Sequence, residues 1–323
     1  MRPLVTIAIP TFNRAEATLR DALGSALAQT YPNLEILVAD NGSTDGTAAL
    51  VTSVRDPRLR YHRHPQNIGP NDNFNFCVAA ARGVYFLLLH DDDLLDPDMV
   101  AACLEAVGDA EDVGLIRTGT RLIDAEGRVL GEHPNEVGGA STRDFFLGWF
   151  TGRTALYLAS TLFNTRRLRE IGGFRSPRNL YQDVVAEVTL AAKFGRADVR
   201  EVKAAFRMHT NMLYSREKIA WWCDDSAYLL ETMCGLLAPE DASILRAVAQ
   251  PAFCRRMYHH ASRLPSRMER MRTYREIARR FDGAYSPVRF VVDRAVGRRV
   301  AMAKRAVRSA LPPWLRRQLA SAT

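Results

Sequence analysis

Short apolar runs alternate with helix-like patterns over the first half of the chain. Residues 5–10 and 34–40 are mainly apolar, and each run ends in residues that favour a turn. Between them lies a segment whose apolar residues recur at helical spacing on one face: Leu19, Ala22, Leu23, Ala26 and Leu27. This alternation is typical of a parallel sheet whose strands are joined by crossover helices.

The same alternation continues to about residue 215. The clearest strand is predicted at residues 84–89, where six apolar residues precede an abrupt acidic stop, as in a central parallel strand. Asp96 is expected to cap the helix that follows, with Pro97 in its first turn. The remaining predictions are strands at 59–62, 113–118 and 155–163, a hairpin over 122–130, and an amphipathic helix marked by Phe74, Cys77, Val78 and Ala81.

Beyond about residue 215 the pattern becomes helical throughout. Two sets of mainly apolar residues follow helical spacing: Ile219, Trp222, Cys223, Ser226, Leu230, Met233 and Leu237, and then Tyr274, Ile277, Ala278 and Phe281. We find no internal repeat and no low-complexity linker in the sequence. The 323 residues are therefore expected to form an α/β domain over residues 1–215 and an all-helical C-terminal region over 216–323.

Basic residues are concentrated in the C-terminal region. The net charge is +8, but residues 251–323 hold 18 Lys or Arg against four acids, so the rest of the chain is acidic. Apolar residues separate the basic ones there, and Trp314 lies near the end. Such a helix either lies on an anionic membrane surface or packs on the first domain with a solvated basic face. Nucleic acid is not expected as a partner, because no aromatic residues are interleaved with a basic motif.

The cysteines and the N-terminus suggest a reducing compartment. The five cysteines form no CxxC pair, which argues against a zinc site or a disulfide framework. The N-terminus lacks the order of basic, apolar and small residues of a signal peptide, and no apolar run approaches the roughly 18 residues of a membrane span. We expect a cytoplasmic protein, peripheral on the inner face of the membrane if its basic tail binds lipid.

Three polar segments follow predicted strands, at residues 10–14, 40–43 and 90–93. Ligands of open α/β sheets bind beyond the carboxyl ends of the strands, so these segments should face one crevice. Asp91, Asp92 and Asp93 repel one another unless a cation offsets their charge. Oxygen ligands favour Mg²⁺ or Mn²⁺, which also binds phosphate oxygens, so the implied ligand is a diphosphate. The alternative is a solvated acidic loop at the start of a helix.

In these segments the chain resembles the family 2 glycosyltransferases with the GT-A fold. The segments that carry the resemblance, in order and spacing, are residues 5–14, 38–47, 67–69 and 89–93 with Pro97. The resemblance covers residues 3–215 and implies a GT-A type, Rossmann-like mixed sheet flanked by helices. It also implies a donor-binding half over about residues 1–110 and an acceptor-binding half over about 111–215.

The resemblance implies a role for several residues of the donor half. Phe12 would lie against a nucleobase, with Pro10 and Thr11 shaping the pocket, and Asp40 would accept a hydrogen bond from the base ring. Asn67 would shape a loop near the donor. The alternatives are a core aromatic for Phe12, a turn-initiating Asp for Asp40 and a simple turn for Asn67.

The acidic segment departs from the family's commonest form, Asp-x-Asp-Asp before a proline. His90 stands where the first Asp is usual, so Asp92 and Asp93 align with the second and third. Asp92 or Asp93 would hold Mn²⁺ or Mg²⁺, and Asp91 would contact the ribose or a second metal position. His209 resembles the His of a late Tyr-Arg-x-His segment and would reach the metal or the diphosphate, unless it is a surface or core histidine.

Asp183 is the expected catalytic base. The Gly-Gly-Phe segment (residues 172–174) precedes Gln182 and Asp183, where the family has a Glu-Asp pair at the start of a helix. A helix-capping Asp is the alternative. With this base the resemblance implies an inverting, single displacement without a covalent enzyme intermediate.

The expected substrates are a UDP, dTDP or GDP sugar and a hydroxyl acceptor on a saccharide or lipid-linked saccharide, in polysaccharide or glycolipid assembly. A sugar nucleotidyltransferase would need a glycine-rich loop after the first strand, and residues 10–14 are not one. An aspartyl phosphatase would need Thr or Val two residues after its second Asp. A catalytically inactive nucleotide-binding scaffold is the remaining alternative, and Asp183 argues against it.

Overall fold

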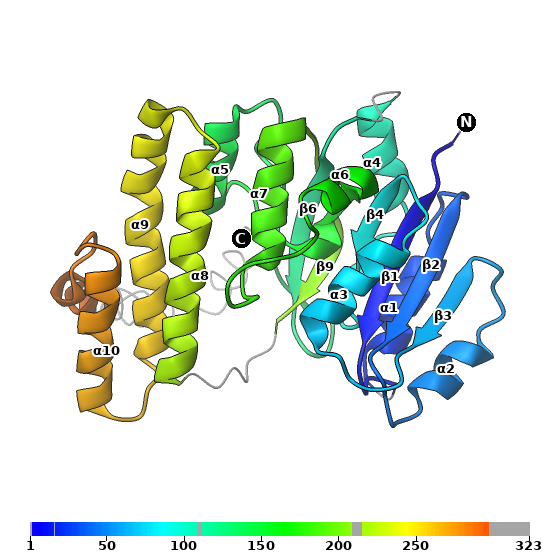
Figure 1. Ribbon diagram of the computed structural model, residues 1–323, viewed down its shortest axis with the longest axis horizontal. Coiled ribbons are helices and arrows are strands. Elements are labelled where there is room, and N and C mark those ends of the chain that lie inside the picture. Colours follow the sequence, from blue (N-terminus) through cyan, green and yellow to red (C-terminus); the bar gives the residue numbers. More distant parts are fainter. Residues whose placement is uncertain (1, 16, 109–111, 209–214, 297–323) are drawn as a thin grey trace, which may run out of the picture. The chain divides into compact units, whose positions relative to one another are not determined.

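The computed structural model describes residues 2–15, 17–108, 112–208 and 215–296. A nine-stranded sheet is its central element (Figure 1). Its strands are β1 (Val5–Thr11), β2 (Leu34–Asp40), β3 (Leu59–Arg63), β4 (Tyr85–Leu88), β5 (Leu94–Leu95), β6 (Leu115–Ile123), β7 (Val129–His133), β8 (Thr161–Asn164) and β9 (Arg196–Arg207). The helices are α1 (Leu19–Leu27), α2 (Thr47–Ser53), α3 (Pro70–Ala80), α4 (Met99–Val107), α5 (Thr142–Thr151), α6 (Thr165–Glu170), α7 (Gln182–Phe194), α8 (Arg216–Gly235), α9 (Pro239–Ala261) and α10 (Arg267–Arg280).

The sheet is mixed, as predicted. The strand order is β3-β2-β1-β4-β8-β6-β9-β5, with β7 paired to β6. The first four strands in this order are parallel, so the carboxyl ends of β1, β2 and β4 lie at one edge. Strand β8 runs antiparallel to both β4 and β6. The expectation that residues 84–89 form a central parallel strand is therefore correct on one side of β4 only.

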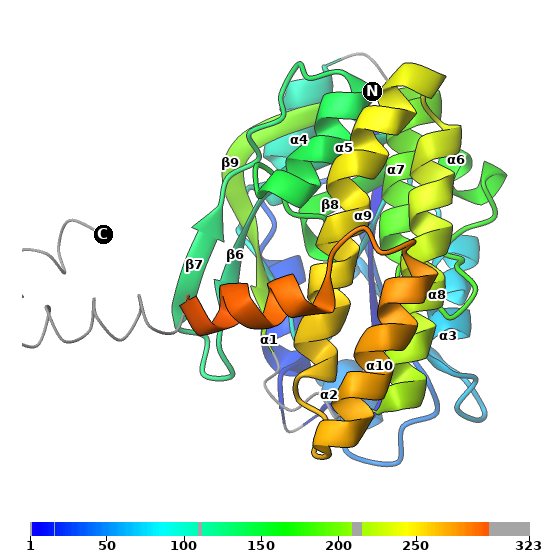
Figure 2. The same ribbon diagram turned by 90° about the vertical axis from the view of Figure 1, so that its left-hand side faces the viewer.

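Helices cover both faces of the sheet (Figure 2). The alternating residues Val5, Ile7 and Ile9 of β1 belong to the same buried cluster as the apolar faces of α1 and α4. On the opposite face α3, α6 and α7 pack, and Phe86 of β4 lies near Phe174 there. Because both faces are covered, the central strands are buried along their whole length, which explains their continuous apolar runs.

Two local predictions were wrong. The helix after the acidic segment begins at Met99 with Asp98 as its N-cap, and the Asp96 side chain forms an ion pair with Arg121. The strand predicted at 155–163 is confined to Thr161–Asn164 and follows a short 3-10 helix (Leu158–Ser160).

The chain forms two compact units. The first comprises Met1–Leu213 with Asp224–Ala249, and the second comprises Tyr214–Cys223 with Gln250–Thr323. Helices α8 and α9 therefore each contribute to both units. The second unit is helical in its described part, as predicted, and residues 287–296 form one more helix there. The catalytic-domain boundary at residue 215 stays a prediction.

Candidate active site

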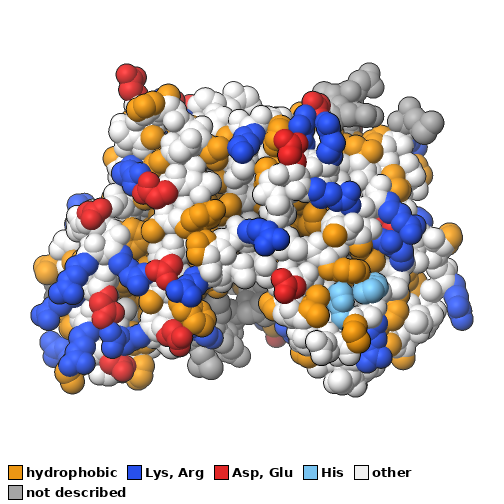
Figure 3. Space-filling model, viewed as in Figure 1, with side chains coloured by type: hydrophobic (Ala, Val, Ile, Leu, Met, Phe, Trp, Pro, Cys, Tyr) orange, Lys and Arg blue, Asp and Glu red, His pale blue; other side chains and the backbone are white. Residues whose placement is uncertain are grey.

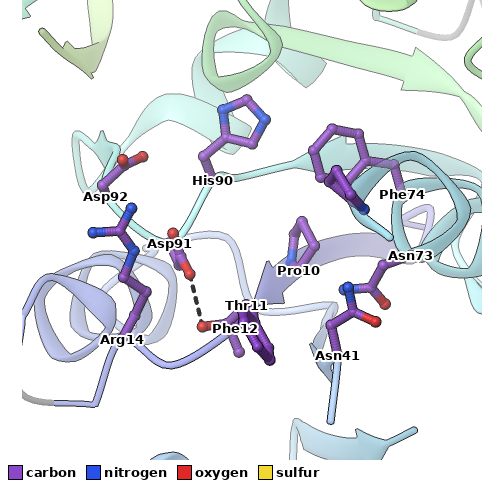
Figure 4. A pocket seen from close by; sticks show the side chains of 11 residues that line it. Pro10, Thr11, Phe12, Arg14, Asn41, Asn73, Phe74, His90, Asp91 and Asp92 are labelled. Carbon is purple, nitrogen blue, oxygen red and sulfur yellow. Dashed lines mark hydrogen bonds between the residues drawn. The ribbon is translucent and has the colours of Figure 1, made fainter. Parts of the chain in front are cut away.

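A cleft of about 350 Å³ lies at the carboxyl ends of β1, β2 and β4 (Figure 4). It is lined by Pro10, Thr11, Phe12, Arg14, Asn41, Pro70, Asn73, Phe74, His90, Asp91 and Asp92. Residues from all three polar segments contribute to this lining. The expectation that these segments face one crevice is therefore confirmed.

Thr11 links the end of β1 to the acidic turn after β4. Its hydroxyl donates a hydrogen bond of 2.7 Å to Asp91 Oδ2. Burial raises the pKa of Asp91, although this hydrogen bond opposes the shift. The contact fixes the Asp91 carboxylate at the wall of the cleft, close to Arg14 in the view of Figure 4.

His90, Asp92 and Asp93 bring three metal-binding atoms within 4.8 Å of one another. His90 Nδ1 lies 3.6 Å from Asp93 Oδ2. Burial alone would lower the pKa of His90, but the hydrogen bond and charge of Asp93, with the charges of Asp92 and Asp183, raise it to about 9. A protonated His90 offsets the negative charge of these carboxylates, as a bound cation would.

The end of β9 holds the acidic turn in place. The backbone N–H of Arg207 donates to Asp93 Oδ1 at 2.9 Å, and its Nε donates to the Asp92 carbonyl at 2.8 Å. Asp93 is 1% exposed and is absent from the lining of the cleft, whereas Asp92 lines it. Asp92 is therefore the carboxylate of this pair that faces the cleft, and Asp93 is oriented by the chain around it.

The donor set fits a divalent cation such as Mn²⁺. Carboxylate oxygens suit Mn²⁺ and Mg²⁺, and two of the three groups, His90 and Asp92, face the cleft. A metal that used His90 would have to displace its proton, because a ligating histidine must be neutral. Metal binding and His90 protonation are thus expected to compete.

Asp40 is fully buried and does not line the cleft, although the next residue, Asn41, does. Its Oδ1 accepts from the Ser43 backbone N–H at 2.8 Å, and its Oδ2 accepts from the Tyr61 hydroxyl at 2.6 Å. Arg63 Nε is 3.8 Å from the same Oδ2. Asp40 therefore organises the end of β2, and contact with a nucleobase would require these partners to move.

Asn41, the next residue, connects β2 to the start of α3. Its amide donates to Asn67 Oδ1 at 3.1 Å, and its Oδ1 accepts from the Ile68 backbone N–H at 2.8 Å. Asn67 also accepts from the Gly69 N–H at 2.8 Å. These bonds position the start of α3. This helix presents Phe74 to the cleft.

Asp183 lies in the first turn of α7. Burial raises its pKa, opposed by a backbone hydrogen bond from Val184 and by the charge of His90. Asp183 and His90 thus lie close enough to influence each other's ionisation. One turn further along α7, the fully buried Glu187 forms a 3.0 Å ion pair with Arg117 of β6, which anchors the helix to the sheet.

A family model described as "Glycosyl transferase family 2" matches residues 6–220, about two thirds of the chain. The chain belongs to this family. Its cleft, acidic turn and Asp183 all lie within the matched residues.

Curated bacterial relatives match over part of this family 2 region. The chain is 35% identical to an Escherichia coli chondroitin synthase over 130 residues, which are 40% of this chain and 19% of that protein. It is 34% identical to the Rhizobium meliloti succinoglycan biosynthesis protein ExoO over 128 residues, 40% of this chain and 36% of that protein. The chain thus spans well under half the length of these relatives.

Solved structures share the fold at low identity. Residues 1–349 of Staphylococcus aureus TarS with UDP-GlcNAc give a TM-score of 0.56 at 13% identity, covering 86% of this chain and 91% of that one. A Pyrobaculum calidifontis mannosyltransferase with GDP-Man and Mn²⁺ gives 0.53 at 18% identity, covering 88% and 86%. These likenesses confirm the predicted GT-A fold.

The structure gathers most of the predicted site residues. Pro10, Thr11, Phe12, Asp91 and Asp92 line the cleft, whereas Asp40, Asn67 and Asp93 do not line it and bond neighbouring backbone or side chains instead. His209 lies outside the described residues, so its role stays a prediction.

The cleft is also lined by five residues to which the sequence gave no site role: Arg14, Asn41, Pro70, Asn73 and Phe74. Phe74 was counted in the apolar pattern of its helix, although its ring lies 5.4 Å from that of His90. Asn73 bridges His64 and the Ala39 carbonyl, contacts that no local pattern indicates. Arg14 and Asn41 lie inside the segments that resemble the family, so their position in the sequence could have marked them as candidate site residues.

Proposed function

We propose that this family 2 protein is an inverting glycosyltransferase. It moves a sugar from a nucleoside-diphosphate sugar to a hydroxyl group of a saccharide or lipid-linked saccharide, in polysaccharide or glycolipid assembly. The observation that carries the proposal is one cleft lined by the aromatic rings of Phe12 and Phe74 and by His90, Asp91 and Asp92, with Asp183 close enough to affect the ionisation of His90. The names of the chondroitin synthase and ExoO relatives support a role in polysaccharide assembly.

The donor nucleotide occupies this cleft. Phe12 is 42% exposed, unusual for a large apolar side chain at the end of a buried strand, and it offers a flat surface to a base. Asp91, which accepts a hydrogen bond from Thr11, would also accept hydrogen bonds from ribose hydroxyls. TarS binds UDP-GlcNAc and the mannosyltransferase binds GDP-Man. These complexes support a nucleotide-sugar donor, but their nucleobases differ and do not identify the base bound here.

Mn²⁺ or Mg²⁺ is the proposed cofactor. Asp92 would hold it, with His90 as a further ligand and Asp93 orienting that imidazole. When bound, the cation stabilises the negative charge that develops on the departing diphosphate. The Mn²⁺ in the mannosyltransferase complex supports this choice.

Asp183 takes the proton of the acceptor. The acceptor oxygen forms a bond to the anomeric carbon while the bond from that carbon to the diphosphate oxygen breaks. The acceptor proton passes to the Asp183 carboxylate and the nucleoside diphosphate leaves with the bonding electron pair. A pKa raised by burial makes Asp183 a stronger base than an exposed Asp, which suits this step.

A turnover screen tests the proposal. The protein is incubated with UDP, dTDP and GDP sugars and Mn²⁺, and nucleoside diphosphate is measured with and without excess chelator. At least one donor is expected to give chelator-sensitive release of nucleoside diphosphate. Release of pyrophosphate would indicate a nucleotidyltransferase, and no release from any donor would indicate a scaffold.

We also propose that the second unit attaches peripherally to an anionic, cytoplasmic membrane face. Val288, Val291, Val292 and Val296 are 49–72% exposed and follow helical spacing on residues 287–296. Arginines gather over the neighbouring α10, with fewer acids among them (Figure 3). An apolar stripe beside basic residues suits a membrane surface, where each base adds about 1 kcal/mol. None of the helices in the described ranges is long and apolar enough to span a bilayer.

The double substitution Val288→Glu with Val292→Glu is expected to reduce binding to anionic vesicles severalfold. It places charge on the exposed stripe and leaves the buried Phe290 in place. Flotation with phosphatidylglycerol vesicles measures the effect, and Val248→Glu on α9, 37% exposed, is the control. Equal flotation of the wild type and both variants would remove the membrane proposal.

A further inference from the structure

The loop that leads into α7 holds the N-terminal end of the helix that carries the proposed base, whereas Glu187 anchors that helix one turn further along. Residues 175–181 connect the Gly-Gly-Phe segment to α7, and Asp183 is the second residue of that helix. A catalytic group must be held within about 0.5 Å of its productive position, and a loop of this length does not do so by itself. The contacts of this loop are therefore informative.

One buried carboxylate binds most of the loop. Asp225 of α8 is fully buried and lies in the first unit. Its Oδ2 accepts from the Ser176 hydroxyl at 2.6 Å and from the backbone N–H groups of Leu180 at 2.8 Å and Tyr181 at 3.2 Å. Its Oδ1 accepts from the Arg178 N–H at 2.8 Å. Hydrogen bonds to a charged acceptor are roughly twice as strong as neutral ones, so this carboxylate fixes the loop backbone.

The contact with Tyr181 reaches the helix itself. Tyr181 is the N-cap of α7 and makes no capping hydrogen bond with its own side chain. Asp225 thus holds the N-cap residue of α7, two positions before Asp183. A shift of this N-cap would move the Asp183 carboxylate with it.

The other end of the loop is held from the donor side. Asn75 of α3 accepts from the Phe174 N–H at 2.8 Å and donates to the Phe174 carbonyl at 2.9 Å. A side chain on Gly173 would place its Cβ 2.3 Å from Asn75 Oδ1, so glycine is required for this approach. The same helix presents Phe74 to the cleft. The loop therefore runs between a donor-side anchor and Asp225.

We propose that Asp225 is a positioning residue for Asp183. It acts through the loop and makes no contact with substrate. A residue of α8 thereby contributes to the position of the catalytic base. The family match ends at residue 220, so this carboxylate lies beyond the matched residues. The inference rests on the proposed function, in which Asp183 is the base.

Asp225→Asn tests the proposal. One oxygen of the carboxylate is replaced by an NH₂ group, which donates and cannot accept the N–H and hydroxyl bonds made there. We expect kcat to fall about 10- to 100-fold, because displacements of about 1 Å can cost 10²-fold. Donor KM and nucleotide binding are expected to stay near wild type, since the cleft is untouched. The acid limb of the pH–rate profile is expected to move with the changed surroundings of Asp183.

The neighbouring Asp224→Asn is the matched control. Asp224 is partly exposed and pairs with Arg178 Nε at 3.3 Å, so its loss should leave kcat within about twofold of wild type, as for surface pairs. If Asp225→Asn does not fold, Ser176→Ala removes one of the four bonds, and a severalfold fall in kcat at unchanged KM is expected.

The outcomes separate this inference from the proposed function. Unchanged kcat in Asp225→Asn, or in Ser176→Ala if the first variant does not fold, would overturn the positioning role. So would a loss that only follows the fraction of folded protein. Wild-type turnover by Asp183→Asn would instead remove the assignment of the base. An inactive Asp183→Asn beside a fully active Asp225→Asn would remove only the role of Asp225.

Discussion

Asp183→Asn is expected to lower the rate of sugar transfer by about 10²- to 10⁴-fold, the usual contribution of a general base. The amide has nearly the shape of the carboxylate and cannot take the acceptor proton. Donor KM should change little, because Asp183 does not line the cleft. Steady-state release of nucleoside diphosphate in the presence of acceptor measures both constants.

The control for Asp183→Asn is Asp21→Asn. Asp21 is an exposed acid in the first turn of α1, as Asp183 is an acid in the first turn of α7. If Asp183 only stabilised the N-terminus of its helix, both variants would lose a little stability and keep their turnover. The raised pKa of Asp183 adds a second check, because the base must be deprotonated. Activity should therefore fall with decreasing pH at values above the ordinary range of an Asp, about 3.9.

Asp92→Asn is expected to lower kcat/KM by about 10²-fold or more and to abolish stimulation by Mn²⁺. Charge stabilisation by a bound metal is worth several kcal/mol in a transition state, and each 1.36 kcal/mol is tenfold in rate. Asp92 lines the cleft, whereas Asp93 is buried against Arg207. Rates measured across a Mn²⁺ titration test this assignment.

Asp98→Asn is the control for Asp92→Asn. Asp98 stands a few residues further on, outside the lining of the cleft, and pairs with Lys203 at 2.5 Å. Its loss should leave the Mn²⁺ response intact. A wild-type Mn²⁺ response in Asp92→Asn would contradict the metal assignment.

The strands and helices of the donor half were predictable because their pattern is local. The strand predicted at residues 34–40 coincides with β2, and the helical face from Leu19 to Ala26 is buried as expected. The apolar residues of β2 and the apolar face of α1 are buried, so burial accounts for most of the pattern that predicts them.

Pairing between distant strands was not predictable in the same way. The antiparallel contact of β4 with β8 joins residues about 80 positions apart, and no local pattern encodes its direction. The strand predicted at 155–163 was too long because the Ser160 and Thr161 hydroxyls bond the Tyr157 carbonyl and close a tight turn. Hydroxyl groups that bond nearby backbone compete with sheet formation in this way.

The site residues also divide into those that a local sequence pattern predicts and those that depend on contacts between distant parts of the chain. The acidic turn and Phe12 follow directly after strands, where ligand-binding residues of α/β sheets are expected. Phe74 and Asn73 enter the cleft because Asn41 ties the start of their helix to β2. Asp225 joins the site through contacts about 45 positions away in sequence. Such residues become visible only once the chain is folded.

The central claim is that the cleft binds a nucleoside diphosphate together with a divalent cation. The most direct test is a thermal melt of the wild type and Asp92→Asn with UDP, dTDP and GDP, each with and without Mn²⁺. A bound ligand raises the melting temperature according to its concentration and affinity. We predict that at least one nucleotide raises the melting temperature of the wild type, more with Mn²⁺ than without it, and that Asp92→Asn loses the Mn²⁺-dependent part. No shift with any nucleotide, with or without Mn²⁺, would contradict the account.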